Sequence, residues 1–458
     1  MKKVIAVFDI GKTNKKFFLF DENYKKVYQK YIAIDEIQDE DGFPTEDLIK
    51  LQKWLKTSVD KILKTSEFDV RAINFSTYGA SFVHLDAAGN VLTPLYNYLK
   101  PLPEKIAVTF NKEHDLKAVS LQTASPEAGM LNSGMQLYWL KQTKPELYKS
   151  IKYSLHFPQY LSFMLTGKPA SEFTSIGCHT ALWDYTKNTY HNWVVKEGLS
   201  SKFPDISPTT KSYTFDHGDK KIKIGTGIHD SSAALIPYLL SEKKPFVLIS
   251  TGTWSITLNP FSANTLTEED IQHNCLNYLT VQGKPVRATR FFLGKEYGLQ
   301  VKKLSTLFNK SKAYHKSIKF DFELYQKLKQ KSHRFFKFDE IRIDSHTEFL
   351  NQDLTTIFSS FKEAYHQLLM ELVSIQVKTV HLAIGKSKIK KIYIDGGFVD
   401  NDIFIKLVAL NFPELKVRTT KSPLGSALGA AMVISEKELG KNFLKSHYKM
   451  RKLKLPLE

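Results

Sequence analysis

The sequence predicts an α/β protein with two related domains, each a mixed β-sheet flanked by helices. A strand, a short polar turn and a returning strand occur in residues 4–20, and the same pattern returns in residues 246–258. In both halves an amphipathic helical segment and a further apolar strand follow. The length of 458 residues and the apolar content of 42% allow each half to bury a core of its own.

The first half opens with β-rich segments separated by polar turns. Leu48, Leu51 and Leu55 then begin a repeat at helical spacing. The pattern predicts strands at residues 4–10, 17–20 and 27–31, a helix at residues 48–62 and a strand at residues 72–75.

The second half repeats this order with longer helices. The pattern predicts strands at residues 246–250 and 254–258, a long helix at 354–383, a strand at 392–394, helices at 402–410 and 425–434, and a strand around Val417. We place the domain boundary near residues 241–244, which gives domains of residues 1–243 and 244–458. No low-complexity linker separates the halves, so we expect them to share an interface.

Composition limits the partners and the compartment. The formal net charge is +18, but the lysines are scattered along the chain, which favours a solvated surface over a nucleic-acid or membrane partner. No stretch approaches the ~18 apolar residues that a bilayer span needs. The two cysteines, Cys178 and Cys275, have no metal-ligand spacing and fit a reducing compartment, so we expect a cytoplasmic protein.

The turn after the first strand carries groups that bind phosphate. Glycine exposes backbone N–H groups, while hydroxyl, amide and ammonium groups add donors. Asp9 precedes this turn, and its oxygens suit Mg²⁺. The simpler alternative is an ordinary hairpin turn. The predicted phosphate-binding residues of this turn are Gly11, Lys12, Thr13, Asn14, Lys15 and Lys16.

The corresponding turn of the second half has the same character. Residues 250–255 read Ser-Thr-Gly-Thr-Trp-Ser, with Gly252 and Thr253 at the centre. Either turn alone is weak evidence. Two such turns in equivalent positions predict a clamp for a polyphosphate.

Asp230 lies between a glycine-rich turn and a helix rich in small residues. A carboxylate at a helix N-terminus is often only a cap. It can also serve as a general base, because the helix N-terminus fixes the carboxylate and favours its ionised form. His229 is next to it and could bind substrate or be structural.

The strand at 392–394 runs into Gly396 and Gly397. Two successive glycines let a backbone approach a flat ligand closely. A tight strand-to-helix turn is the alternative reading.

Together these segments resemble the FGGY carbohydrate kinase family of the actin-like ATPase superfamily. The matching order is an Asp-Ile-Gly opening, Asp230 after a glycine turn, Gly252-Thr253, Gly396-Gly397 and a small-residue helix at residues 424–431, over nearly the whole chain. The resemblance implies two actin-like (ribonuclease H-like) domains with an interdomain cleft, and ATP and Mg²⁺ as cofactors.

Within this family the motifs are most similar to the rhamnulokinase subfamily. The resemblance implies that Asp230 is the catalytic base and that Asp9 and Asp230 bind the metal. It also implies that the sugar contacts Tyr78, Gly79 and His229. It assigns the sugar and the base to the first domain and the nucleotide to the second. It further implies that Lys12 to Lys16 and Thr253 contact the phosphates, with Gly397 and Asn401 near the adenosine.

The chain departs from the family pattern in several places. Its first turn is lysine-rich where the family has a Thr/Ser-rich turn that ends in Arg, and Asp395 occupies the place of a third glycine. The substrate Asn of the subfamily has no clear counterpart around Arg290.

We therefore expect an ATP-dependent kinase of a small sugar, with L-rhamnulose or L-fuculose first and a xylulose-type ketose next. The alternatives are an ATP-switched regulator or assembly protein, and a kinase for a non-ketose acceptor. The expected partners are a sugar and MgATP, with no nucleic acid and no membrane. Formation of a homodimer is left open.

Overall fold

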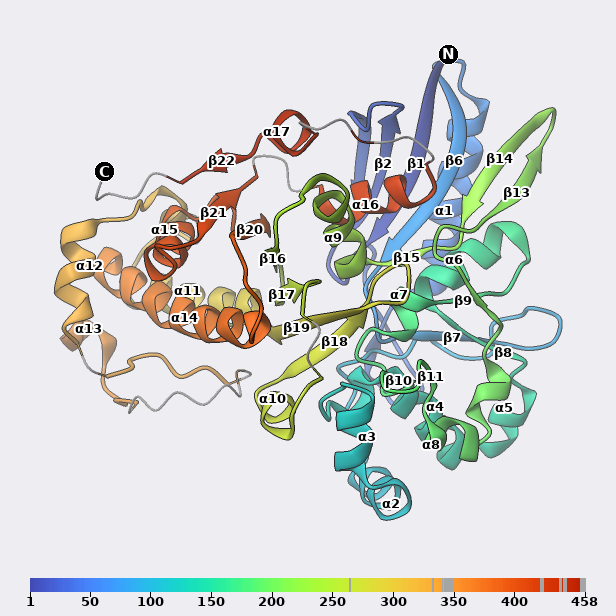
Figure 1. Ribbon diagram of the computed structural model, residues 1–458, viewed down its shortest axis with the longest axis horizontal. Helices are drawn as coiled ribbons and strands as arrows, with labels where there is room; N and C mark the ends of the chain where they lie inside the picture. Colours follow the sequence, from blue (N-terminus) through green and yellow to red (C-terminus); the bar gives the residue numbers. More distant parts are fainter. Residues whose placement is uncertain are drawn as a thin grey trace.

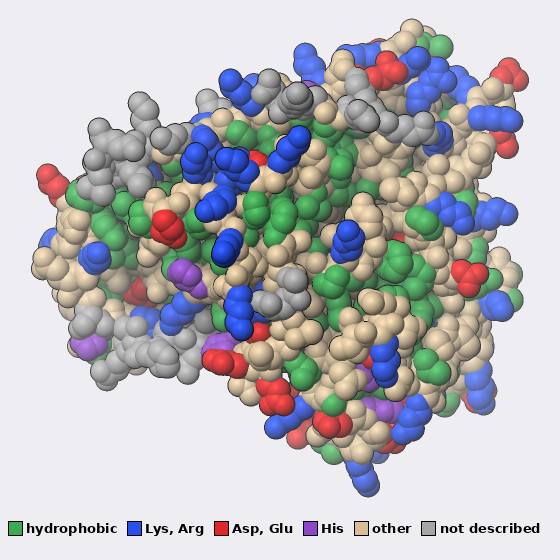
Figure 2. Space-filling model, viewed as in Figure 1, with side chains coloured by type: hydrophobic (Ala, Val, Ile, Leu, Met, Phe, Trp, Pro, Cys, Tyr) green, Lys and Arg blue, Asp and Glu red, His purple; other side chains and the backbone are tan. Residues whose placement is uncertain are grey.

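The computed structural model describes residues 1–262, 265–331, 333–339, 341, 349–420, 424–435, 439 and 443–453. Two large sheets lie side by side and carry helices on their faces (Figure 1). Lys and Arg side chains occur over both halves of the face in Figure 2, with Asp and Glu among them. Among the described helices, none is both long enough and apolar enough to cross a bilayer.

The first sheet has the strand order β13-β14-β6-β1-β2-β3, and β15 pairs with β6. Its strands are β1 (Lys2–Ile10), β2 (Lys15–Asp21), β3 (Lys26–Ile32), β6 (Phe68–Thr77), β13 (Ser212–His217), β14 (Lys220–Gly225) and β15 (Ile228–His229). The strands β1, β2 and β3 form an antiparallel meander, whereas β6 is parallel to β1, β14 and β15. The strands predicted in the first half are confirmed.

The second sheet has the order β18-β19-β17-β16-β20-β21-β22. Its strands are β16 (Phe246–Thr251), β17 (Ser255–Asn259), β18 (Cys275–Leu279), β19 (Pro285–Phe291), β20 (Lys391–Gly396), β21 (Lys416–Thr419) and β22 (Arg451–Lys452). An antiparallel meander of β16, β17 and β19 is followed by β20 and β21, both parallel to β16. This order repeats that of the first sheet, so the predicted internal repeat is confirmed.

The alternation of side chains along β1 builds a different core on each face of the first sheet. Ala6 and Phe8 pack with α1 (Leu48–Lys64) and α6 (Phe157–Thr166), whereas Val7 packs with α9 (Asp230–Ser241) and α16 (Gly425–Val433). The second of these clusters also contains residues of the second sheet. The two halves therefore share a buried interface, as expected from the missing linker.

Helices of the second half pack mainly around α14, which lies against the second sheet. The helices of this region are α11 (Leu293–Leu307), α12 (Phe322–Lys329), α13 (Leu354–Ile357), α14 (Phe361–Ile384) and α15 (Asp402–Asn411). The prediction of one helix over 354–383 is wrong. The chain breaks after α13 because the Ser359 backbone and hydroxyl both donate to Glu363, and Ser360 caps α14 by accepting from the Glu363 N–H.

The remaining described elements surround the lower part of the first sheet or join the main elements. The helices are α2 (Glu104–His114), α3 (Leu116–Gln122), α4 (Ser133–Thr143), α5 (Pro145–Ser150), α7 (Phe173–Ile176), α8 (Asn192–Lys196), α10 (Glu268–Gln272) and α17 (Phe443–His447), with 3₁₀ turns at Gly129–Leu131, Leu199–Lys202 and Tyr314–Ser317. Short strands are β4 (Ile37–Gln38), β5 (Pro44–Thr45), β7 (Phe82–Leu85), β8 (Tyr153–His156), β9 (Ser171–Glu172), β10 (Trp183–Asp184), β11 (Thr189–Tyr190) and β12 (Ile206–Ser207).

The helices α9 and α16 cross closely between the two sheets, near the centre of Figure 1. A Cβ atom on Gly429 would lie 1.8 Å from the carbonyl oxygen of Ala233. The side-chain amide of Asn74 on β6 donates to the Ala430 carbonyl, which ties α16 to the first sheet. The C-terminal helix thus packs on the N-terminal sheet, whereas the domain boundary near residues 241–244 stays a prediction.

This crossing makes a substitution test of the interface. We expect Gly429→Ala to lower the free energy of unfolding by about 1–3 kcal/mol, because the backbone of α9 must move away from the added methyl group. Gly298 on α11 is the matched control, since a Cβ there meets nothing within 4 Å. Gly298→Ala should raise stability by about 0.5–1 kcal/mol through helix propensity. Thermal unfolding of both variants beside the parent checks this, and equal midpoints for the two variants would contradict it.

Candidate active site

Parallel pairing brings three segments of the first half to one edge of the sheet. The register aligns the last residues of β1, β6 and β15 with one another. The next residues along the chain are Gly11, Tyr78 and Asp230, so the first turn, the predicted sugar residues and the predicted base all begin at this edge. In the second sheet the same register aligns Thr251 with Gly396.

A cleft of about 680 Å³ lies where these two edges meet. It is lined by both glycine turns and by the glycines that follow β20. Of the residues predicted for the site, the cleft is lined by Gly11, Lys12, Thr13, Asn14, Lys16, Tyr78, Gly79, His229, Asp230, Gly252, Thr253, Gly396 and Gly397.

Three predicted residues, Asp9, Lys15 and Asn401, are not among those that line the cleft, and Asp9 is described below with the acidic groups. The Lys15 ammonium is buried and points to Glu46, with Nζ–Oε distances of 2.8 and 2.9 Å. The Asn401 side chain accepts a hydrogen bond from the Phe404 N–H at the start of α15 and donates to the Tyr365 hydroxyl. Their assignment to the nucleotide stays a prediction, and both have structural partners here.

Acidic residues hold the lysines of the first turn in place. Lys12 pairs with Glu36 at 2.6 Å, and Lys16 lies 3.5 Å from Asp9. Both ammonium groups are partly exposed and belong to residues of the cleft lining. The turn therefore presents positive charge to the cleft in fixed positions, as an anion site requires.

The second turn is held by backbone contacts, and one of its neighbours, Gly396, can only be glycine. Gly252 N donates to the Trp254 carbonyl at 2.8 Å, and Gly397 N donates to the Thr251 carbonyl at 2.7 Å. Gly396 has a φ of +92°, and a Cβ there would lie 1.9 Å from the Thr251 oxygen. The glycines thus allow the end of β20 to pack against the turn.

Asp230 is the first residue of α9 and a third of its side chain is exposed to the cleft. Burial raises its pKa to about 7, and the negative charge of Asp9 adds to the shift. The Ser231 hydroxyl donates to Oδ1 at 3.1 Å and opposes it. A carboxyl group with a pKa near neutrality, in contact with a cleft, is suited to general acid–base catalysis.

His229 is neutral, because burial lowers its pKa to about 3. Its Nε2 lies 3.2 Å from Asp230 Oδ1 and 3.0 Å from Cys178 Sγ. A Cβ on Gly79 would come within 2.5 Å of the same sulfur and 3.1 Å of the His229 ring. Glycine at position 79 is therefore needed to bring this loop against His229.

The two carboxyl groups predicted for the metal, Asp230 in the cleft lining and the buried Asp9, fit a magnesium ion. Asp9 is buried; its Oδ1 accepts from the Ser426 hydroxyl at 2.8 Å and its Oδ2 faces Lys16. The negative charge of Asp9 contributes to the raised pKa of Asp230, so the two carboxyl groups repel each other. Two carboxylates with oxygen ligands only are a favourable environment for a hard cation.

Several residues of the cleft lining were not among the predicted site residues. Trp254 lies in the second turn and stacks on Phe292, with ring centroids 3.4 Å apart. Tyr98, Tyr278 and Arg290 also line the cleft. Trp254 stands inside the predicted phosphate-binding turn, which was a signal for it, whereas no local motif marks Tyr98, Tyr278 or Arg290.

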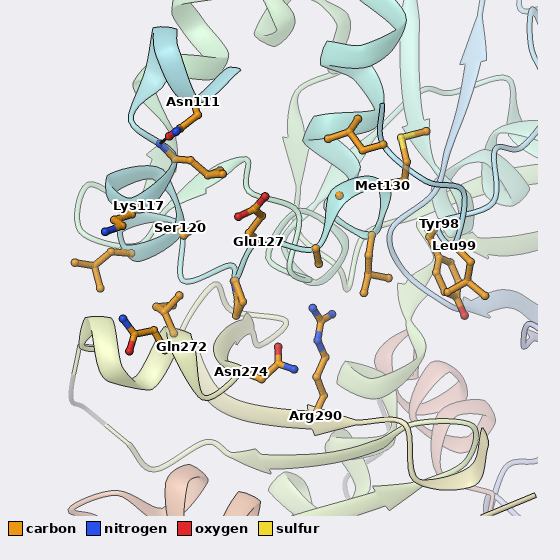
Figure 3. Close-up of a pocket in the computed structure, with 18 of the residues that line it drawn as sticks. Tyr98, Leu99, Asn111, Lys117, Ser120, Glu127, Met130, Gln272, Asn274 and Arg290 are labelled. Atoms are coloured by element: carbon orange, nitrogen blue, oxygen red, sulfur yellow. Dashed lines mark hydrogen bonds between the residues drawn. The ribbon is translucent and has the colours of Figure 1, made fainter. Parts of the chain in front are cut away.

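A larger cavity of about 1080 Å³ adjoins the cleft, between α3 and α10 (Figure 3). The two cavities share Tyr98, Leu131, Trp254 and Arg290 as lining residues. These four side chains form the passage between them.

Comparison with known proteins agrees with this geometry. Residues 4–236 match the model of the N-terminal domain of the FGGY family of carbohydrate kinases, and residues 243–322 match that of the FGGY C-terminal domain. A rhamnulokinase from Halalkalibacterium halodurans is 24% identical over 261 residues, which are 54% of this chain and 54% of the relative. The chain thus spans about half the length of the curated relatives it matches.

Solved structures confirm the predicted fold class of two actin-like domains. A ligand-bound xylulose kinase from Lactobacillus acidophilus superposes with a TM-score of 0.81 at 17% identity, over 99% of this chain and 94% of that one. A gluconate kinase from the same organism also has a TM-score of 0.81 at 17% identity, over 100% and 94% of the two chains. A xylulose kinase and a gluconate kinase thus resemble this chain equally well, so the fold does not identify an acceptor.

Proposed function

Because this chain belongs to the FGGY family of carbohydrate kinases, we propose that it transfers the γ-phosphoryl group of ATP to a hydroxyl group of a small carbohydrate. The observation that carries the proposal is the cleft itself. Two turns rich in glycine and hydroxyl groups, one from each half, line the same cleft as the carboxyl group of Asp230, whose pKa is raised to about 7.

In this proposal the triphosphate lies between the turns at Gly11 and Gly252, with Lys12 and Lys16 near its charges. The adenosine lies toward Gly396 and Gly397. Phosphoryl transfer requires little covalent chemistry from the protein, so the fixed positions of these donors account for most of the rate.

Asp230 is proposed as the base. Its carboxylate accepts the proton of the acceptor hydroxyl while the acceptor oxygen bonds to the γ-phosphorus and ADP leaves with the electrons of the broken bond. His229 is proposed to contact the sugar together with Tyr78 and Gly79. Since His229 is neutral, it binds as a hydrogen-bonding group and not as a charge.

Mg²⁺ is the proposed metal, held through Asp9 and Asp230, directly or through water. When bound it neutralises phosphate charge. The Ser426 hydroxyl, which belongs to the cleft lining, donates to Asp9 and holds its carboxyl group in place.

The match to a rhamnulokinase supports a ketose as the acceptor, with L-rhamnulose and L-fuculose first and a xylulose-type ketose next. The cytoplasm is the proposed compartment, because both cysteines are free and buried.

Coupled ADP release tests the proposal with a panel of L-rhamnulose, L-fuculose, D-xylulose, D-gluconate, glycerol and acetate. We expect turnover that requires both MgATP and a carbohydrate. ATP hydrolysis that no acceptor stimulates, or light scattering that increases with nucleotide because the protein polymerises, would instead support an ATP-switched regulator or assembly protein.

A further inference from the structure

Arg290 is a buried cation at the junction of the cleft and the larger cavity. It lies on β19, is 3% exposed and lines both cavities. Figure 3 shows its side chain extending from the strand into the larger cavity. Arginine remains protonated in proteins, so a full positive charge is present at this junction.

No acidic group of the described chain pairs with Arg290, and its buried Nε has no hydrogen-bond partner. Its described contact is with the Trp254 ring, whose centroid lies 5.4 Å from the guanidinium carbon. Arg287 on the same strand is different, because it donates to the Leu382 carbonyl at 2.7 Å and pairs with Asp270. Burying an unpaired charge costs several kcal/mol, so Arg290 is poorly explained as a structural residue.

The groups that surround Arg290 are neutral. Burial raises the pKa of Cys178, of Tyr278 and, to about 12, of Tyr98. Burial and the Arg290 charge keep the pKa of His179 well below its usual value. The positive charge is therefore uncompensated by its neighbours.

These neutral neighbours connect Arg290 to the proposed sugar side of the cleft. The ring of Tyr278 lies 5.3 Å from that of His229 and 6.0 Å from that of His179. Cys178 contacts His229 directly. A ligand that reaches Asp230 from this side meets Arg290 at its other end.

We propose that Arg290 is a specificity-determining residue that binds the acceptor, donating hydrogen bonds to a pair of oxygen atoms at the end remote from the reacting hydroxyl. The inference rests on the proposed kinase function. A planar guanidinium matches two neighbouring oxygens, either the carboxylate of a sugar acid or the adjacent hydroxyl and carbonyl oxygens of a ketose. The larger cavity leaves room for this end of the acceptor.

Steady-state kinetics of Arg290→Met test the proposal with the acceptor that the parent turns over best. We expect the KM of the acceptor to rise about 10- to 100-fold, the loss typical of hydrogen bonds to a charged group, and the KM of ATP to change less than about 3-fold. Lys117→Met is the matched control, because Lys117 is an exposed cation of the same cavity. It should leave both constants unchanged.

Thermal unfolding of ligand-free Arg290→Met separates binding from structure. Removing an unpaired buried charge should leave the unfolding midpoint unchanged or raise it. A lowered midpoint with an unchanged acceptor KM, or a KM increase for ATP as large as that for the acceptor, overturns the proposal.

Arg290→Lys identifies the oxygen pair. If D-gluconate is the preferred acceptor, the ammonium charge should restore part of the affinity lost in Arg290→Met. If a neutral ketose such as L-rhamnulose is preferred, Arg290→Lys should resemble Arg290→Met, because the paired geometry is lost. A parent enzyme that turns over none of the panel refutes the kinase function itself, which is a different result from an unchanged KM.

Discussion

Asp230→Asn should reduce kcat by at least about 10²–10⁴-fold, the usual contribution of a general base. The amide cannot accept the proton of the acceptor hydroxyl, but it keeps the size of the side chain. The Ser231 hydroxyl and the start of α9 remain available to hold it. Steady-state kinetics with ATP and the preferred acceptor measure the effect.

Nucleotide binding provides the control for Asp230→Asn. The turns at Gly11 and Gly252 are unchanged in this variant, so ADP should still bind in a calorimetric titration without acceptor. Near-parental turnover in Asp230→Asn would remove this residue from the mechanism. Loss of ADP binding together with activity would indicate a structural effect instead.

The carboxyl group of Asp230 also predicts how kcat/KM depends on pH. A base must be ionised, and the pKa of Asp230 in the free protein is raised to about 7 by burial and by Asp9. Below this value kcat/KM should fall by about tenfold per pH unit, and above it kcat/KM should reach a plateau. His229 does not titrate in this range, because its pKa is about 3.

Asp395 is the competing carboxyl group, since burial raises its pKa to about 6 and it also lines the cleft. Its carboxylate accepts from the Tyr238 hydroxyl at 2.9 Å and from the Gly396 N–H. In Asp395→Asn the inflection near pH 7 should persist. Its disappearance in that variant would assign the titration to Asp395.

Glu46→Gln should lower the free energy of unfolding by about 3–5 kcal/mol, because it leaves the buried Lys15 ammonium without its counter-ion. Both side chains are only 2% exposed. Glu46 also accepts a hydrogen bond from the Tyr78 hydroxyl at 3.3 Å, so it joins the first turn to the predicted sugar side. Urea unfolding of variant and parent under identical conditions measures the loss.

The double variant Lys15→Met/Glu46→Gln is the internal control. With both charges removed no unpaired ion remains, so the double variant should be more stable than the sum of the two single losses predicts. Strict additivity would show that the pair does not interact as a unit. That result would mean that the Lys15–Glu46 ion pair does not hold the first turn in position.

Local sequence patterns were sufficient for most of the elements. Alternation and helical repeats predicted α1 and the central strands β1, β2, β3, β6, β16, β17, β20 and β21, but not the outer strands β13, β14, β18, β19 and β22 or the short β15. The recurring strand-turn-strand order predicted two related domains. The helix over 354–383 failed because side-chain capping by Ser360 outweighed a continuous apolar repeat. Capping is decided by a hydrogen bond that periodicity does not encode.

The sequence by itself determined which residues are candidates for phosphate binding and acid–base chemistry, because glycine turns and carboxylates at strand ends are local features of the chain. Only the tertiary structure decided which of them meet. It turned Lys15 and Asn401 toward structural partners, packed the C-terminal helix α16 on the first sheet, and placed Arg290 without a counter-ion beside the cleft. These outcomes depend on contacts between residues far apart in the chain, within one half for Lys15 and Asn401 and between the halves for α16, and such contacts leave no trace in local composition.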